Sequence, residues 1–161
     1  MNQLEAVSDF LAQRTLAVVG VSRNQRKFGF MVYQALKTRG YRVLPVNPHA
    51  EVIAGEQVYK TLDSLPQKVD GVLVVVSPLH AQQVVREAFE AGIRRVWLQQ
   101  GSESSGAVRF CEERGMNVVY GKCILMFTEP VTSIHKLHRW MWKITGKIPR
   151  QAAVAGGSNV H

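Results

Sequence analysis

Residues 20–29 combine two glycines, a serine and three cations, a set of groups suited to holding phosphate. Glycine permits a tight turn and lets backbone N–H groups approach an anion closely, and a helix N-terminus favours negative charge. The serine hydroxyl and the cationic side chains add further donors. The segment therefore predicts an anion-binding loop. Its predicted ligand-binding residues are Gly20, Val21, Ser22, Arg23, Arg26, Lys27 and Gly29.

The loop departs from the usual dinucleotide fingerprint. After Gly20, a G-x-G-x-x-G pattern would place glycines where Ser22 and Gln25 stand. The next strand would end near an acid that binds the ribose of NAD, but it ends in Asn47 and Pro48. These differences favour a nucleotide held in another way. An NADP-binding redox protein, with Arg23 or Arg42 on the 2′-phosphate, stays open as an alternative.

A buried strand and a helix are predicted on either side of this loop. Leu16–Val19 is a short apolar run, typical of a strand covered on both faces. Phe28, Val32, Ala35 and Leu36 then follow the spacing of one helical stripe, and Gly40 suits a helix end.

The same alternation continues along the chain. Further strands are expected at 41–46, 71–76, 95–98 and 117–120. Helices are expected before the first strand, from Ser77-Pro78 to Gly92, and from Ser102 or Ser104 to Gly115. Residues 49–65 read as irregular, with a short extended piece and one helical turn at 61–65 capped by Thr61. The pattern predicts an α/β fold with a five-stranded parallel sheet of order 3-2-1-4-5 and helices on both faces.

Several ordered motifs resemble the CoA-binding domain family of small Rossmann-like proteins. The motifs are G-V-S-R-N-Q-R-K-F-G, Y-R-V-L-P-V-N-P, G-E-Q-V-Y-K-T-L, V-V-V-S-P and V-W-L-Q-Q-G, and they span roughly residues 16–130. That family is similar to the nucleotide-binding domain of the succinyl-CoA synthetase α subunit. The first loop reads G-V-S where the family more often has G-A-S. The resemblance implies coenzyme A as the ligand and a Rossmann-like three-layer fold.

The resemblance also implies a place for each part of the ligand. Phosphate groups would lie on Gly20, Ser22, Arg23 and Lys27. Asn47, Pro48, Ser77 and Pro78 would line the adenosine pocket, and the pantetheine arm would run toward Gln99, Gly101 and Cys123. Each residue has a simpler interpretation as well: Asn47-Pro48 is also a common turn. Cys123 has Lys122 beside it, which would favour a thiolate and mixed-disulfide chemistry with the ligand thiol.

Charge and composition limit the class of protein. The formal net charge is +8, but five cations lie after Glu129, so the preceding chain carries only +3. This mild charge, without a basic patch interleaved with aromatics on a strand, argues against a nucleic-acid-binding domain. No secretory leader or membrane-spanning run is visible, so we expect a cytoplasmic protein. Two cysteines, Cys111 and Cys123, predict reduced thiols, with Cys111 in the core, and no metal-ligand spacing occurs.

The last part of the chain differs from the rest. We expect the CoA-binding domain to occupy residues 1–130, a basic amphipathic helix residues 131–149 and a disordered tail residues 150–161. The stretch Ile134 to Lys147 would pack on the body or a second subunit, or bind a protein partner or an acidic surface. A scaffold protein that acts through this helix is the second open alternative, and both a monomer and a homodimer are compatible with the sequence.

No motif for catalysis is present. The sequence lacks a G-x-S-x-G elbow, a Walker motif and H-E-x-x-H, and His80 has no partner carboxylate at a readable spacing. The expectation is therefore a non-catalytic module that binds coenzyme A or an acyl-CoA, with the acyl length left open.

Overall fold

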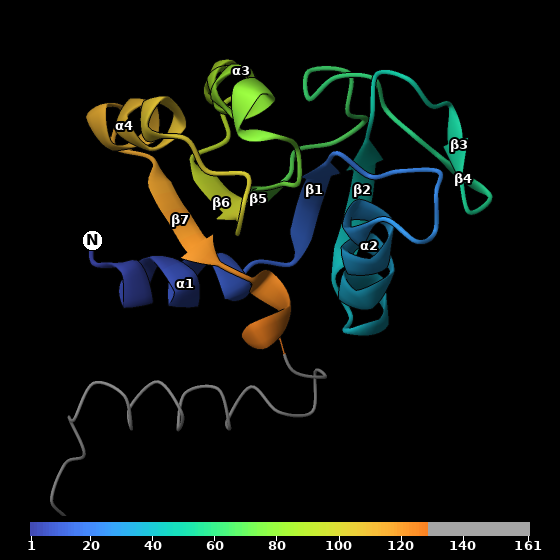
Figure 1. The fold of residues 1–161 in the computed structure, drawn as a ribbon, viewed down its shortest axis with the longest axis horizontal. Coiled ribbons are helices and arrows are strands. Elements are labelled where there is room, and N and C mark those ends of the chain that lie inside the picture. Colours follow the sequence, from blue (N-terminus) through green and yellow to red (C-terminus); the bar gives the residue numbers. More distant parts are fainter. Residues whose placement is uncertain (129–161) are drawn as a thin grey trace, which may run out of the picture.

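Five short parallel strands form the centre of the computed structural model, which describes residues 1–128 (Figure 1). The strands are β1 (Thr15–Val19), β2 (Arg42–Val46), β5 (Gly71–Val74), β6 (Arg95–Gln99) and β7 (Asn117–Lys122). All four residues of β5 are buried, as are the last four of β1 and of β6. This burial explains why the strands read as continuous apolar runs.

Helices cover both faces of this sheet (Figure 1). One layer contains α1 (Gln3–Leu11), α2 (Phe28–Thr38) and the 3₁₀ turn η1 (Ile124–Met126); the other contains α3 (Pro78–Glu90) and α4 (Ser105–Glu113). The predicted three-layer α/β fold is confirmed. Pro78 opens α3 and Ser104 caps α4 through a hydrogen bond from Ala107 N, as the sequence indicated.

The strand order is β2-β1-β5-β6-β7, so the predicted order 3-2-1-4-5 is wrong. In chain order the strands run 2-1-3-4-5. The outer edge of β2 is occupied by Tyr59, whose N–H donates to Pro45 O and whose carbonyl accepts from Asn47 N. The third long strand, β5, pairs instead with the other side of β1. The preference for right-handed crossovers permits both 3-2-1-4-5 and 2-1-3-4-5, because it does not say whether the third strand pairs with β2 or with β1.

The connection between β2 and β5 also differs in detail. It contains a two-stranded antiparallel hairpin, β3 (Val52–Ile53) and β4 (Glu56–Gln57). The Glu56 carboxylate accepts from the Tyr33 hydroxyl and pairs with the Lys37 ammonium group, so the hairpin is tied to α2. Residues 61–65 form one hydrogen-bonded turn, in which Leu65 N donates to Leu62 O at 3.4 Å, but no helix. The predicted cap by Thr61 is wrong, because Thr61 N donates to Ser64 Oγ instead.

Aromatic packing joins the sheet to the α1 layer. Trp97 on β6 is fully buried, and its ring makes edge contacts with Phe10 and Phe127 at centroid distances of 5.5 and 5.8 Å. Its indole N–H donates to Lys122 O at 3.1 Å, which satisfies the polar atom of a buried ring. This contact fixes the end of β7 beside β6.

The predicted basic helix at 131–149 and the tail at 150–161 lie outside the described residues. Within residues 1–128, no helix is both long and apolar enough to cross a membrane.

The two cysteines differ in environment, which predicts different thiol reactivity. Cys111 is fully buried, and burial, with a smaller effect of the Glu112 carboxylate, raises the pKa of its thiol to about 12. Cys123 is half-buried. In native protein at neutral pH, an aromatic disulfide reagent should modify Cys123 first and Cys111 only on unfolding, because the thiolate is the reactive species. Cys123→Ser should abolish modification of the native protein. Equal modification rates at Cys111 and Cys123 would contradict the predicted difference in reactivity.

Candidate ligand-binding site

The carboxyl end of β1 lies between β2 and β5, which pair with it in parallel, one on each side. Val19 pairs with Val46 on β2 and with Val74 on β5. Gly20 N donates to Val46 O at 3.1 Å, and Val75 N donates to Val19 O at 2.8 Å. The strand order reverses at this point, and in open α/β sheets ligands bind beyond the carboxyl ends of the strands at such a place.

Two glycines allow α2 to begin directly against the end of β1. A Cβ atom on Gly20 would lie 2.3 Å from Val75 O, and its φ of +103° is a conformation that other residues rarely adopt. A Cβ atom on Gly29 would lie 2.3 Å from Gly20 O. Backbone is therefore in contact with backbone at both positions, which leaves the helix start close to the strand end.

Side chains order the loop between these glycines. Ser22 Oγ accepts from Asn24 N, and Asn24 Oδ1 accepts from Arg26 N, each at 3.0 Å. The predicted cations Arg23, Arg26 and Lys27 are exposed, and none of them has an ion-pair partner within residues 1–128. Their positive charge is therefore not neutralised by the described part of the chain.

The N-terminus of α2 is open. Lys27 occupies the N-cap position with no side-chain hydrogen bond to the helix, and the first turn contains no acidic residue. By contrast, Asn2 caps α1 with a full capping box. An uncapped helix start presents unpaired backbone N–H groups and the positive end of the helix dipole. The start of α2 can therefore bind an anion.

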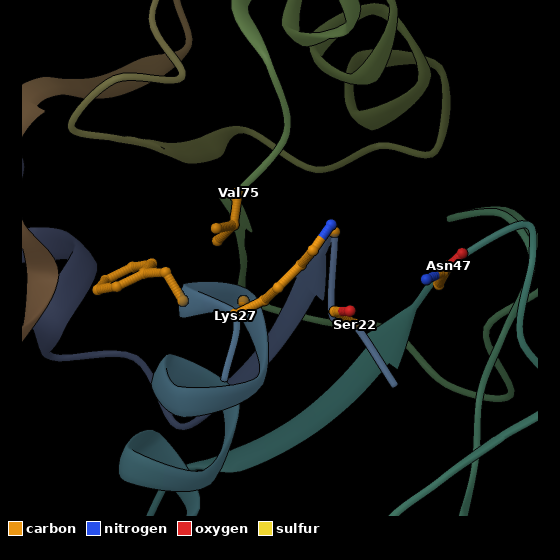
Figure 2. Close-up of a pocket in the computed structure, with 7 residues that line it drawn as sticks. Ser22, Lys27, Asn47 and Val75 are labelled. Atoms are coloured by element: carbon orange, nitrogen blue, oxygen red, sulfur yellow. The ribbon is translucent and has the colours of Figure 1, made fainter. Parts of the chain in front are cut away.

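A pocket of about 420 Å³ lies at this helix start (Figure 2). The residues that line it are Gly20, Ser22, Lys27, Phe28, Gly29, Asn47 and Val75. Figure 2 shows the Lys27 side chain extending from the beginning of α2 into the space between Val75 and Ser22. Five of these seven residues were predicted from the sequence. Phe28 and Val75 were missed. Phe28 follows the apolar stripe of the predicted helix and Val75 the apolar run of the predicted strand, so both were assigned to the core.

Asn47 connects the two loops that form the pocket. Its Nδ2 donates to Val21 O at 2.7 Å, and its Oδ1 accepts from His49 N at 2.8 Å. Asn47 therefore both forms the turn, as its simpler interpretation predicts, and lines the pocket. The Val21 side chain is fully buried and packs in the core, so at this position only the backbone can face a ligand.

Three residues of the predicted adenosine pocket lie outside this lining. Pro48, Ser77 and Pro78 are exposed, just beyond the ends of β2 and β5. Ser77 is the N-cap of α3 but gives it no side-chain hydrogen bond; its Oγ is 2.9 Å from His80 Nδ1 instead. Their contact with adenosine stays a prediction.

The predicted pantetheine residues lie farther along the sheet. β6 and β7 are two and three strands from β1, about 10 and 14 Å at the usual strand spacing. Gln99 is buried, and its Oε1 accepts from Ile124 N at 3.1 Å. Gly101 is exposed and its N–H donates to a Glu103 carboxylate oxygen, whereas Cys123 is half-buried. The Gln99 side-chain carbonyl is therefore used within the fold; passage of a ligand arm here stays a prediction.

The position of Arg42 excludes one proposed role. Arg42 begins β2, and the pocket lies at the other end of this five-residue strand, about 13 Å away. The suggestion that Arg42 could hold a 2′-phosphate at the loop is wrong. The five-residue separation of Arg42 and Asn47 in the sequence does not show how far Arg42 lies from the pocket. The direction of β2 determines that distance.

A family model described as a CoA binding domain matches residues 14–129 of the chain. The chain belongs to this CoA-binding domain family. The match covers every strand of the sheet and the whole pocket.

The chain is also similar to individual proteins. The chain is 29% identical over 126 residues to the acetate–CoA ligase [ADP-forming] II subunit alpha of Pyrococcus furiosus, a match covering 71% of the chain and only 28% of that subunit. It is 29% identical over 111 residues to the uncharacterized protein YneT of Bacillus subtilis, covering 69% of the chain and 82% of YneT. A solved structure of a conserved hypothetical protein from P. furiosus is 40% identical with a TM-score of 0.67, covering 70% of the chain and 97% of that protein.

The Asn47 contacts give a testable consequence. In Asn47→Asp, a carboxylate would face Val21 O without a hydrogen to donate, so two acceptors would oppose each other. We expect the free energy of unfolding to fall by about 1–3 kcal/mol, measured by urea denaturation. Asn24→Asp is the matched control, because Asn24 only accepts a hydrogen bond through its side chain and a carboxylate can do the same. Equal losses in both variants would show that added charge, and not the lost donor, is responsible.

Proposed function

We propose that the chain binds coenzyme A or an acyl-CoA in this pocket and performs no chemistry on it. The observation that carries the proposal is the open N-terminus of α2, which meets Lys27 and Ser22 in one pocket at the switch point of the sheet. Coenzyme A is a phosphate-rich ligand, and the pocket offers backbone, hydroxyl and ammonium donors for phosphate. The family assignment supports the same ligand class.

Each donor has a distinct task in this proposal. The backbone N–H groups at the start of α2 bind phosphate oxygens along the helix dipole. Ser22 Oγ accepts a hydrogen bond from Asn24 N, which leaves its own hydroxyl hydrogen free to point at the ligand. The Lys27 ammonium group adds a charge-assisted contact. Arg23 and Arg26, exposed on the same loop, raise the local concentration of the anion.

The lining of the pocket supports binding without catalysis. Its seven residues include no carboxylate, histidine or cysteine, and within residues 1–128 no hydrogen bond joins Ser22 Oγ to Lys27 Nζ, so the serine hydroxyl has no base in place to activate it. The P. furiosus relative is titled a ligase subunit, but the chain matches only about a quarter of it. We therefore propose no ligase activity for this chain.

The pocket also favours coenzyme A over NAD. An acidic side chain at the end of the second strand would accept from both ribose hydroxyls, but Asn47 stands there and its Oδ1 already accepts from His49 N. Of the two arginines considered for a 2′-phosphate of NADP, Arg42 lies at the other end of β2, which leaves Arg23.

Calorimetric titration with coenzyme A, acetyl-CoA, NAD and NADP tests the ligand. We expect saturable binding of coenzyme A, weakened about tenfold or more in Lys27→Ala, because a charge-assisted hydrogen bond contributes roughly 1.5–3 kcal/mol. Lys68→Ala is the matched control, an exposed lysine outside the pocket lining. No binding of coenzyme A, tighter binding of NADP, or equal weakening in both variants would refute the proposal.

Incubation of the protein with acetyl-CoA tests the absence of chemistry. Free thiol should appear no faster than in buffer when followed with a thiol reagent on the deproteinised mixture, because the pocket lining has no carboxylate, histidine or cysteine and its one hydroxyl, that of Ser22, is not activated by a base. Thiol release that scales with protein concentration and is lost in Lys27→Ala would show that the site is catalytic.

A further inference from the structure

Two large apolar side chains are exposed in the layer that contains α1, α2 and η1. Met31 on α2 has an exposed fraction of 50%, and Met126 on η1 has one of 78%. Ala35 and Leu125, on the same two elements, are half-buried. We call these four residues the methionine face. Apolar surface in contact with water gains free energy when another apolar surface covers it.

The two halves of the methionine face lie beside each other. Met31, Ala35 and Arg39 follow one another at intervals of four residues, so they share one flank of α2. The Arg39 guanidinium donates to Thr128 Oγ1, two residues after Met126 (Figure 1). This flank of α2 therefore faces η1, and the exposed methionines border the same surface.

The opposite flank of α2 is covered by the chain itself. Tyr33 and Lys37 each come two residues after a member of the methionine face, about 200° around the helix. Both side chains bind the Glu56 carboxylate of the β3–β4 hairpin. Within residues 1–128, α2 thus has one flank held by a hairpin and one flank on which Met31 is half exposed.

The described part of the chain ends at the methionine face. Thr128 is its last residue, it is buried, and residues 129–161 follow it. In the sequence of that segment, Ile134, Leu137, Met141 and Ile144 are three or four positions apart, which is the spacing of one apolar helical stripe. An apolar stripe that lacks an assigned partner therefore begins a few residues beyond an apolar surface that lacks a cover.

We propose that residues 131–149 dock their apolar stripe on the methionine face of the same chain. The sequence alone left this segment several partners: the body of the chain, a second subunit, another protein or an acidic surface. The position of Thr128 beside α2 favours the first of these.

Chain length supports docking within one molecule. The six residues from Thr128 to Ile134 span up to about 20 Å. Met31 is eight positions before Arg39, about 12 Å along α2, so the stripe can reach the whole face. A segment on such a short connection has an effective concentration on the order of 1 mM at the face. A second copy at micromolar concentration offers the same contacts and competes poorly with it.

Charge determines which side of the segment faces the body. Its cations lie on the side opposite the stripe: Lys136, Arg139, Lys143 and Lys147. Arg39 borders the methionine face, and like charges repel each other there. The apolar side is therefore the one that docks, and the cations face water.

Oxidation of Met126 by dilute hydrogen peroxide, followed by peptide mass spectrometry on the full chain, tests the proposal. We expect Met126 to oxidise at least about fivefold more slowly in native protein than in urea, because a covered thioether is protected. The double variant Leu137→Glu/Ile144→Glu should lose this protection, since each change places a charge in the apolar contact. Val154→Glu is the matched control, an apolar residue outside the stripe, and should change the rate less than about twofold.

A second readout starts from the face itself. Met31→Gln should speed trypsin cleavage after Lys136, because an undocked segment is open to the protease. Leu79→Gln is its control: Leu79 is 85% exposed at the start of α3, away from the face, and its loss should leave cleavage unchanged. Cys111 must stay unreactive toward a thiol reagent in every variant, which shows that the core is intact.

Three outcomes would overturn the proposal. Met126 could oxidise at the same rate in native and in unfolded protein. The Leu137→Glu/Ile144→Glu and Val154→Glu variants could have equal effects. Protection of Met126 that disappears on dilution of the protein would assign the cover to a second copy instead.

Discussion

The contact of backbone with backbone where β1, β5 and α2 meet is the constraint on which the site depends. Gly20 approaches the Val75 carbonyl, and Gly29 approaches the Gly20 carbonyl, so closely that neither position has room for a Cβ atom. This approach sets the start of α2 directly over the end of the central strand. The pocket, the open helix terminus and the position of Lys27 all follow from it.

Local patterns in the sequence were enough to predict the elements and the anion loop. Hydrophobic runs, helix caps and glycines after helices depend on residues within one or two turns, and within residues 1–128 they placed the α-helices and the long strands correctly. The order of the strands depends on whether the third long strand, β5, pairs with the outer edge of β2 or with the free edge of β1. Tyr59 pairs with the outer edge of β2, so that β5 pairs with β1 instead. Tyr59 lies in a stretch without a regular pattern, so its pairing could not be predicted from the neighbouring residues.

The site was predictable to the same extent. Gly20, Ser22, Lys27, Gly29 and Asn47 could be named, because a phosphate loop is continuous in the chain and the next strand ends beside it. Phe28 and Val75 could not, since an apolar residue that lines a pocket has the same sequence signature as one in the core. Gln99 has a structural task that the sequence did not show: its side-chain carbonyl accepts from Ile124 N, and its contact with a ligand stays a prediction.

The hydrogen bonds of Ser22, Asn24 and Asn47 have a consequence for the thermodynamics of binding. Fixing the backbone of a flexible loop costs about 1–2 kcal/mol for each residue. Here that conformational entropy has already been lost on folding, since side chains of the protein itself hold the loop in shape. An arriving ligand therefore meets a preorganised site, and the attraction between its phosphates and the open helix terminus can appear as affinity with little loss to loop ordering.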